Sequence, residues 1–224
     1  MLNHGLAFLT VSMDLTVYAH AVCSIGGYIT ANAAQTKRKD MRLKDPRIPA
    51  LEADQWSQEA QTLMQPFVDQ GRTFNIFKTL ANHPELAKRW MIFANHILGK
   101  SSINVRDREL VILRIGYLCQ AGYEWGQHVL IARQAGLTDD EINACKSGPE
   151  TPGLGGLDQL LLQATDELHH DSHVSDETWG ALTKHYDTQQ MMDLVFTVGQ
   201  YNLVSMALNS FGVQPDADLP GWDI

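Results

Sequence analysis

Helix signals recur along the chain from residue 41 onward, whereas the alternation of polar and apolar residues that marks strands does not. Residues 138–141 read TDDE, a complete capping box for the start of a helix. Asp187 is a residue type that caps helix starts, and Gly212 is a type that ends helices. Residues 56–68 carry apolar side chains at close to a 3.6-residue period. This pattern predicts an all-α fold.

The same signals set approximate bounds for the helices. Pro84 can start a helix that Gly99 ends, and Asn104 can cap the next one. A loop rich in glycine and proline is expected at 146–156. The tail at 214–224 has two prolines and three aspartates and is expected to wrap the surface. Helices are expected over residues 56–68, 84–98, 105–120, 123–135, 139–145, 157–170, 176–186 and 188–211.

The charge and cysteine content exclude several classes of protein. Acidic residues outnumber basic ones 26 to 17, which gives a formal net charge of -9. A protein that binds nucleic-acid backbones carries a basic stripe, so no nucleic-acid partner is expected. Cys23, Cys119 and Cys145 are too few and too scattered for a disulfide framework or a zinc site. A reducing compartment is the default, so a cytoplasmic location is expected.

Residues 1–40 differ from the rest of the chain, because they hold a single charged side chain, Asp14, before Lys37. The moderately apolar stretch at 15–31 contains polar residues and two glycines, which makes it marginal as a membrane-spanning helix. A signal peptide would need a basic residue ahead of its apolar core, and none is present there. Three interpretations stay open: a loosely docked extension, an artefact of start-codon choice with Met41 as the natural start, or a membrane or targeting segment.

Glu124 and His128 are four residues apart, so on a helix they share one face. A carboxylate beside an imidazole raises the pKa of the imidazole and orients its ring. Such a pair can transfer protons at neutral pH. The alternative is a surface contact that stabilises the helix by roughly 0.2–0.5 kcal/mol. The spacing alone leaves both interpretations open.

Glu109 and Arg114 lie in or beside the apolar run at 110–118. A charge in such a run is costly unless it is paired. One interpretation is that both side chains bond to neighbouring helices and only fix the packing. The other is that Glu109 reaches the Glu124–His128 pair and that Arg114 receives an anionic group of a substrate.

Other chemically interesting residues favour structural roles. Cys119 ends a predicted helix, where nothing activates a thiol, so a buried packing cysteine is expected. Tyr123 and Trp125 flank Glu124 and either wall a pocket or belong to the core. The histidines at 169, 170 and 173 lie among acidic residues, but neighbouring histidines on a helix point in different directions. A solvated helix end is therefore expected there, with no metal site. Phosphate-binding loops and nucleophile elbows are absent from the sequence.

Three stretches together resemble the carboxymuconolactone decarboxylase family, part of the alkylhydroperoxidase D-like (AhpD-like) superfamily. They are residues 106–114 (RDRELVILR), 123–128 (YEWGQH) and 132–141 (ARQAGLTDDE). Supporting stretches at 46–49, 82–86 and 193–201 extend the likeness over residues 41–213. The resemblance implies a helical domain over residues 41–224, with 1–40 outside it, in an AhpD-like bundle that assembles into a homo-oligomer, commonly a trimer or hexamer.

The peroxidase branch of this family carries a glutamate, a Cys-x-x-Cys pair that begins twelve residues later, and a histidine four residues after the second cysteine. Counted from Glu109, these positions hold Ala121, Glu124 and His128. The glutamate and histidine match, but both cysteines are absent. Because one sulfur must attack the peroxide and the other must resolve the sulfenic acid, the resemblance favours the decarboxylase branch, which often carries a Tyr-Glu-Trp stretch.

The resemblance implies a cofactor-free lyase that acts on a small carboxylated lactone or oxo-acid, a small-molecule carboxylate. His128 would be the general acid, Glu124 would orient it, and Glu109 would complete the relay. Arg114 would hold a carboxylate of the substrate, beside Tyr123 and Trp125. No membrane partner is expected. Two alternatives stay open: a thiol peroxidase that works through Cys119, and a non-catalytic oligomeric binding or scaffold protein.

Overall fold

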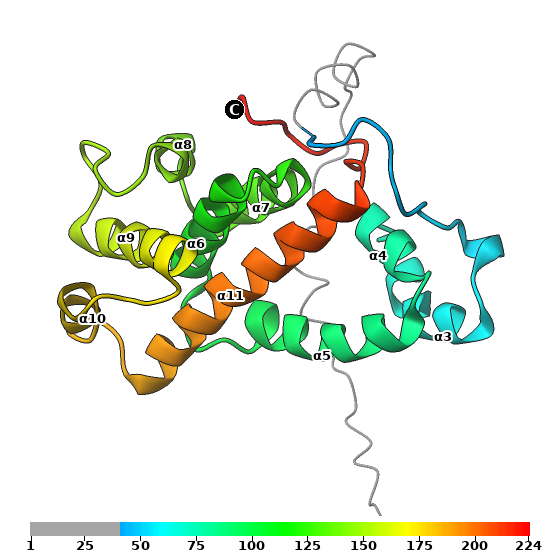
Figure 1. Ribbon diagram of the computed structural model, residues 1–224, viewed down its shortest axis with the longest axis horizontal. Coiled ribbons are helices and arrows are strands. Elements are labelled where there is room, and N and C mark those ends of the chain that lie inside the picture. The colour runs from blue at the N-terminus through cyan, green and yellow to red at the C-terminus, as the bar shows by residue number, and fades with distance from the viewer. Residues whose placement is uncertain (1–40) are drawn as a thin grey trace, which may run out of the picture.

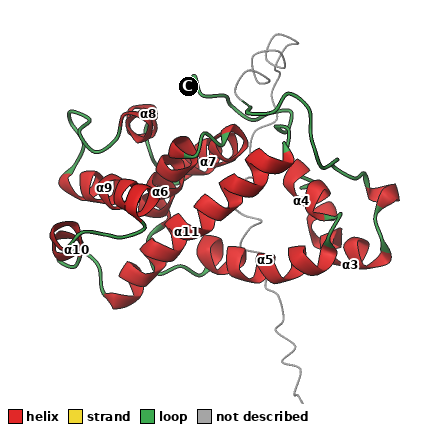
Figure 2. Ribbon diagram, in the orientation of Figure 1, coloured by secondary structure: helices red, strands yellow, loops and turns green. Residues whose placement is uncertain are grey.

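The computed structural model describes residues 41–224, and the three interpretations of residues 1–40 lie outside this part of the chain. Helices follow one another through the described residues, which contain no strand (Figure 2), so the all-α prediction is confirmed. Within residues 41–224, no helix combines the length and the hydropathy needed to cross a bilayer. The elements are η2 (Ala53–Gln55), α3 (Gln58–Val68), α4 (Asn75–Leu80), α5 (Pro84–Gly99), α6 (Val105–Leu118), α7 (Gly122–Gln134), α8 (Asp139–Ser147), α9 (Gly156–Asp171), α10 (Asp176–Leu182) and α11 (Thr188–Phe211).

Most helices begin where the sequence supplies a capping side chain. The side chain of Asn104 accepts a hydrogen bond from the backbone of Asp107, and Thr138 and Asp187 form complete capping boxes for α8 and α11. At the far end of α11, Gly212 adopts φ 71°, the left-handed conformation that favours glycine. These local signals explain why the predicted bounds lie close to the observed ones.

Two of the α-helices differ from the prediction. Helix α4 was not expected, because its N-cap residue Phe74 has no side chain that can cap; the first backbone amide, of Asn75, donates instead to Asp216 in the distant tail, at 2.9 Å. Helix α10 was expected to end near Tyr186 but ends at Leu182. The chain leaves the helix there and brings the hydroxyl of Tyr186 within 2.6 Å of Asp107 on α6.

Helix α6 lies at the centre of the fold and packs against α7, α8, α9 and α11 (Figure 1). Its apolar run at 110–115 is almost completely buried in the main hydrophobic core. Helix α11 crosses one side of the molecule and meets α5 at an open angle, with α3 and α4 beyond. Helices α3, α4 and α5 share a second, smaller core. The junction between these two parts is where the candidate site lies.

The C-terminal tail packs more deeply than predicted. It was expected to wrap the surface, but Leu219 is buried and Trp222 packs against Trp125 of α7, with ring centroids 5.3 Å apart. Gly126 on α7 allows this approach, because a Cβ at that position would lie 2.8 Å from the carbonyl oxygen of Pro220. The tail is therefore part of the core that supports α7.

Candidate active site

Two consecutive helices supply the ionisable groups of the candidate site. Glu109 lies on α6, and Glu124 and His128 lie one turn apart on α7. A short link joins the two helices, and within it Gln120 adopts φ 51°, in the left-handed region. This tight link lets α7 pack back against α6, so that Glu109 faces His128 across the contact.

The imidazole of His128 lies between the two carboxylates. Its Nδ1 is 2.5 Å from Oε2 of Glu109, and its Nε2 is 2.9 Å from Oε1 of Glu124. Glu109 is fully buried, and the other two side chains are at most 6% exposed. The alternative of a surface Glu–His contact therefore does not hold. The structure brings together the three ionisable residues that the sequence singled out as catalytic.

A fourth charged group, Arg108, completes this cluster. Its Nε and Nη2 donate to Oε1 of Glu109 at 3.0 and 2.8 Å, and its Nη1 donates to the carbonyl oxygen of Leu98 at 2.7 Å. With His128 protonated, the two positive charges balance those of Glu109 and Glu124, as buried charges require. Sequence reasoning assigned Arg108 no role, although its position beside Glu109, ahead of an apolar run, was a usable signal.

The two carboxylates set the protonation state of His128. Burial by itself lowers the pKa of an imidazole, but the charges and hydrogen bonds of Glu109 and Glu124 outweigh it and raise the pKa of His128 to about 9. Burial likewise favours neutral Glu109, but His128 and Arg108 hold the pKa of its carboxyl below the usual value. At neutral pH the group at the centre is therefore an imidazolium that donates to a carboxylate at each end.

A small cavity borders one side of this cluster. Its volume is about 30 Å³, which is room for a water molecule or a small reacting group. Among the described residues, Glu124 and His128 are the charged side chains that line it, beside the amides of Gln127 and Gln200. Most of the remaining wall is aliphatic or aromatic. Tyr201 of α11 meets the edge of the His128 ring at a centroid distance of 4.8 Å and an interplanar angle of 85°, which helps to fix the ring.

The structure corrects the prediction that Arg114 receives a substrate anion. Its Nε and Nη2 donate to the two carboxylate oxygens of Asp166 on α9, at 2.6 and 2.7 Å. Its Nη1 donates to the carbonyl oxygens of Cys145 and Lys146, so the guanidinium is already paired. The guanidinium also lies against Gly148, where a Cβ would be 2.8 Å from Nη2. Arg114 therefore ties α6 to α9 and to the end of α8, and it does not line the cavity.

The two aromatic residues beside Glu124 have different positions. Tyr123 lines the cavity, while its hydroxyl donates to Asp216 of the tail at 2.6 Å. Trp125 does not line the cavity: its indole donates to the carbonyl oxygen of Gly221 at 3.1 Å, and its ring packs against Trp222. Trp125 is thus a core residue under the tail, which corrects its assignment as a substrate contact.

The cysteines described by the structure lie outside the cavity. Cys119 is half-buried at the end of α6, its Sγ is 3.1 Å from Oδ1 of Asn202, and burial raises the pKa of its thiol. Burial also raises the pKa of Cys145 well above the usual value. Over residues 41–224, no group of three or more histidine, cysteine, aspartate or glutamate side chains is arranged to hold a metal ion.

Comparison with known proteins agrees with this geometry. Residues 84–158, which include α6 and α7, match the carboxymuconolactone decarboxylase family. The chain is therefore similar to that family over about a third of its length. Its sequence is 27% identical over 116 residues to the uncharacterized protein YdfG of Bacillus subtilis. The aligned residues cover 50% of this chain and 79% of YdfG. The family segment contains all four charged residues of the buried cluster.

Solved structures show that the fold is AhpD-like. A peroxidase-related protein from Ralstonia eutropha, described as an alkylhydroperoxidase AhpD core, superposes with a TM-score of 0.68 at 18% identity; the match covers 77% of this chain and 93% of that one. The debrominase Bmp8, solved in complex with 2,3,4-tribromopyrrole, superposes with a TM-score of 0.62 at 14% identity and the same coverage. This chain therefore shares its architecture with proteins of different described activities.

Proposed function

We propose that this protein is a cofactor-free lyase that removes carbon dioxide from a small oxo-acid or carboxylated lactone by proton transfer. The observation that carries the proposal is the imidazolium of His128, held between two buried carboxylates at the wall of a mostly apolar cavity. A group of this kind can deliver a proton without a cofactor.

The substrate supplies the electron sink of the reaction. When its carbon–carbon bond to the carboxylate breaks, the electron pair moves into the conjugated carbonyl group and forms a dienolate. The protein's part is to position the substrate, to exclude water and to return one proton to the dienolate. An apolar cavity also disfavours the compact charge of the carboxylate more than the spread charge of the transition state.

The geometry suggests a different order of proton transfer from the one expected from the sequence. Glu109 and Arg108 do not line the cavity, whereas Glu124 lines it and pairs with Nε2 of His128. The proton would therefore pass from Nε2 through the carboxylate of Glu124 to the substrate. Glu124 is then the catalytic residue that touches the substrate, His128 holds the proton, and Glu109 positions the ring and stabilises its charge.

The test is carbon dioxide release by the purified protein from a panel of muconolactone-type acids and conjugated oxo-acids. Replacing His128 by Gln should lower turnover about 10²–10⁴-fold, the usual contribution of a general acid. His96→Gln is the matched control, because His96 is about half exposed, pairs with Asp193 and does not line the cavity. Turnover at the wild-type rate in folded His128→Gln, or no release from any acid in the panel, contradicts the proposal.

A thiol peroxidase is the second candidate, supported by the peroxidase-related description of a structural neighbour. Within residues 41–224 it would have to use Cys119, since Cys145 is fully buried. Peroxide consumption with a thiol reductant would then be lost in Cys119→Ser and kept in His128→Gln. The lyase proposal predicts the reverse dependence for carbon dioxide release.

A further inference from the structure

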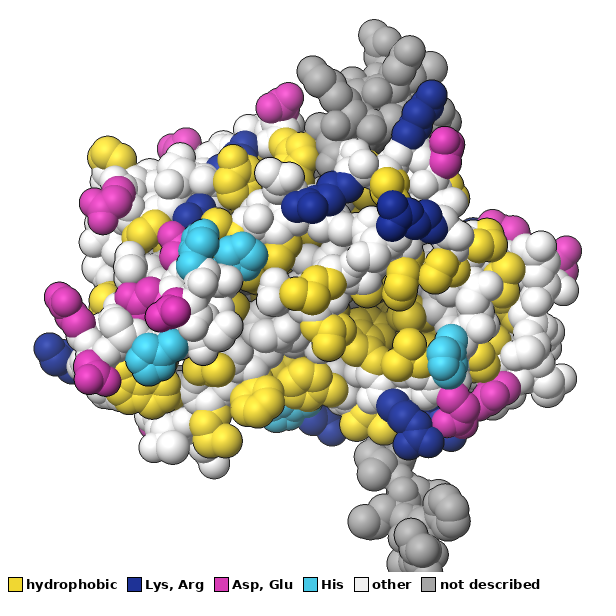
Figure 3. Space-filling model, in the orientation of Figure 1, with side chains coloured by type: hydrophobic (Ala, Val, Ile, Leu, Met, Phe, Trp, Pro, Cys, Tyr) yellow, Lys and Arg dark blue, Asp and Glu magenta, His cyan; other side chains and the backbone are white. Residues whose placement is uncertain are grey.

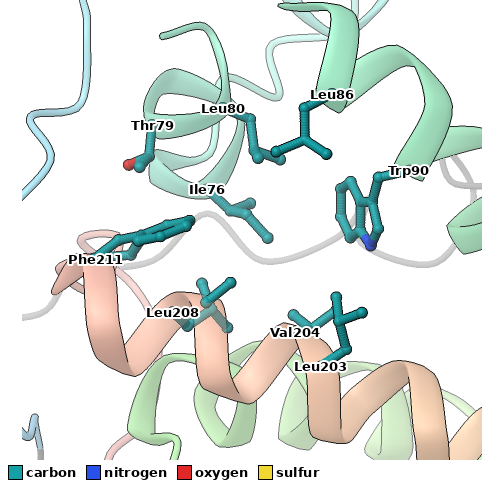
Figure 4. Close-up of a pocket in the computed structure, with 11 residues that line it drawn as sticks. Ile76, Thr79, Leu80, Leu86, Trp90, Leu203, Val204, Leu208 and Phe211 are labelled. Carbon is teal, nitrogen blue, oxygen red and sulfur yellow. The ribbon is translucent and has the colours of Figure 1, made fainter. Parts of the chain in front are cut away.

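A larger cavity adjoins the small one at the candidate site. It has a volume of about 290 Å³ and lies between α4, α5 and α11 (Figure 4). Ile76, Trp90 and Val204 line both cavities, so the two share a wall. We call the larger one the outer chamber and the smaller one, beside Glu124 and His128, the inner chamber.

The outer chamber is lined by apolar side chains. Figure 4 shows Leu80 and Leu86 on one side and Leu208 and Phe211 on the other, all directed toward the space between them. No charged side chain of the described residues lines it, and the hydroxyl of Thr79 already donates to a backbone carbonyl within α4. An apolar space of this size lies at the small end of the range for ligand sites and favours an apolar occupant over water.

A buried hydrogen-bond donor lies at the junction of the two chambers. Among the described residues, the indole N–H of Trp90 is buried and has no hydrogen-bond partner. Figure 4 shows its nitrogen turned toward α11, on the side of Val204, which also lines both chambers. Buried donors are nearly always paired, so an unpaired one beside a cavity needs a physical explanation.

We propose that the two chambers together bind one ligand, a carbonyl compound with an apolar body. The body occupies the outer chamber, the carbonyl oxygen accepts the hydrogen bond of Trp90 at the junction, and the reacting end reaches Glu124 in the inner chamber. The assignment of the reacting end rests on the proposed function. Binding of the apolar body and of the carbonyl group does not rest on the proposed function, because it depends only on the chamber walls and on Trp90.

The first test is the dependence of binding on chain length. Straight-chain methyl ketones from butanone to decanone are suitable probes, because they carry the carbonyl group and have no carboxylate to lose. Their affinity, measured by calorimetry, should rise roughly fourfold for each added methylene until the outer chamber is full, and then level off. Affinity that does not change with chain length overturns the proposal, as does the absence of measurable binding.

Two variants separate the two parts of the site. Ala207→Phe fills the outer chamber from α11 and should abolish the gain in affinity with chain length, while Gln189→Phe, exposed in the first turn of the same helix, should keep it. Trp90→Phe removes the hydrogen-bond donor. It should lower the affinity for every ketone about fivefold and leave the affinity for the matching 1-alkenes unchanged. An unaltered chain-length series in Ala207→Phe, or equal losses for ketones and alkenes in Trp90→Phe, overturns the assignment.

The outcome is independent of the lyase proposal. If the ketones bind as expected but no acid releases carbon dioxide, the binding site stands and the proposed reaction is wrong. If carbon dioxide is released but the affinity for the ketones does not change with chain length, the proposed reaction stands and the outer chamber is not part of the ligand site. Circular dichroism and thermal melting of each variant confirm that the fold is intact before binding is compared.

Discussion

At the scale of the residue, His128 depends most on its neighbours, because each ring nitrogen meets a different buried carboxylate. Its pKa of about 9, against 6.5 for an ordinary histidine, means that the folded protein binds a proton more tightly than the unfolded chain does. The stabilisation is therefore fully present below pH 6.5 and is lost as the pH rises through about 9. This difference makes the buried cluster testable without knowledge of a substrate.

We expect the free energy of unfolding to fall by about 3 kcal/mol between these two pH values, since each pKa unit corresponds to ~1.4 kcal/mol. Urea unfolding across this pH range measures the fall in the free energy of unfolding. The part of this fall that is due to His128 should be absent in His128→Gln. A direct NMR titration should place the His128 midpoint well above that of exposed histidines. An ordinary midpoint would favour the alternative of a non-catalytic scaffold.

Glu109 provides a second prediction at this scale. Replacing it by Gln leaves Arg108 and the imidazolium of His128 buried without their counter-charge, and should destabilise the fold by about 3–5 kcal/mol. Glu85→Gln is the matched control, because Glu85 and its partner Arg89 lie on the surface of α5, where ion pairs contribute little. Similar urea midpoints for the two variants would show that the cluster does not hold the core together.

At the scale of the element, α6 depends on polar contacts made on more than one of its faces. One face presents Glu109 to α7, and another presents Arg114 to Asp166 of α9. In Arg114→Gln, Asp166 and two backbone carbonyls lose their charged partner, so stability should fall by about 2–4 kcal/mol. Turnover per folded molecule should stay within about twofold of wild type. A large rise in KM with unchanged stability would instead restore the substrate-binding role predicted from the sequence.

The contact between α7 and the tail gives another prediction at the same scale. A methyl group at Gly126 would press on the backbone of Pro220 and on Leu219, so Gly126→Ala should destabilise the fold by about 1–3 kcal/mol. Gly180→Ala is the matched control: it also lies in a helix, but open space surrounds it, so it should be neutral or slightly stabilising. Thermal melting of both variants tests this prediction. Equal melting temperatures would mean that the tail can move away from the added methyl group without loss of stability.

At the scale of the whole molecule, residues 41–224 leave one apolar face of their own uncovered. Met192, Phe196, Leu203 and Met206 form a stripe along α11, each more than half exposed, and the spacing follows a heptad pattern. Asp193 is the one charged residue in this helix. Figure 3 shows the apolar surface continuing beyond the stripe, and the exposed large apolar residues of α5 are Leu86, Ile92 and Phe93. Together these side chains offer on the order of 700 Å² of surface, close to the ~800 Å² that each partner contributes to a typical stable interface.

We therefore expect a second copy of the chain to cover this face, in line with the homo-oligomer predicted from the family resemblance. Replacing Met192 and Met206 together by Glu should lower the mass measured by light scattering, because neither charge could be buried at the contact. Trp179→Glu is the control, since Trp179 is exposed on α10, away from the stripe. A wild-type monomer, or a double variant of unchanged mass, contradicts the expectation.

The sequence predicted those features whose signals lie within a few neighbouring residues. Capping boxes and the pairing of Glu124 with His128 span three or four residues, so they are visible without tertiary structure. Helix α4 was missed because its first amide is satisfied by Asp216, far along the chain. Arg114 was misassigned because its five-residue spacing from Glu109 turns it about 140° around the helix axis, toward α9.

The ends of most helices, the family resemblance and the pairing of Glu124 with His128 on α7 were predictable from the sequence, because backbone capping and side-chain spacing act over a single turn. Only the tertiary structure decided that Glu109 and Arg108 complete a balanced buried cluster around His128, and that Trp90 lies between two adjoining chambers. These features arise where α4, α5, α6, α7 and α11 meet. The residues concerned are far apart in the chain, and their contacts depend on how whole helices pack.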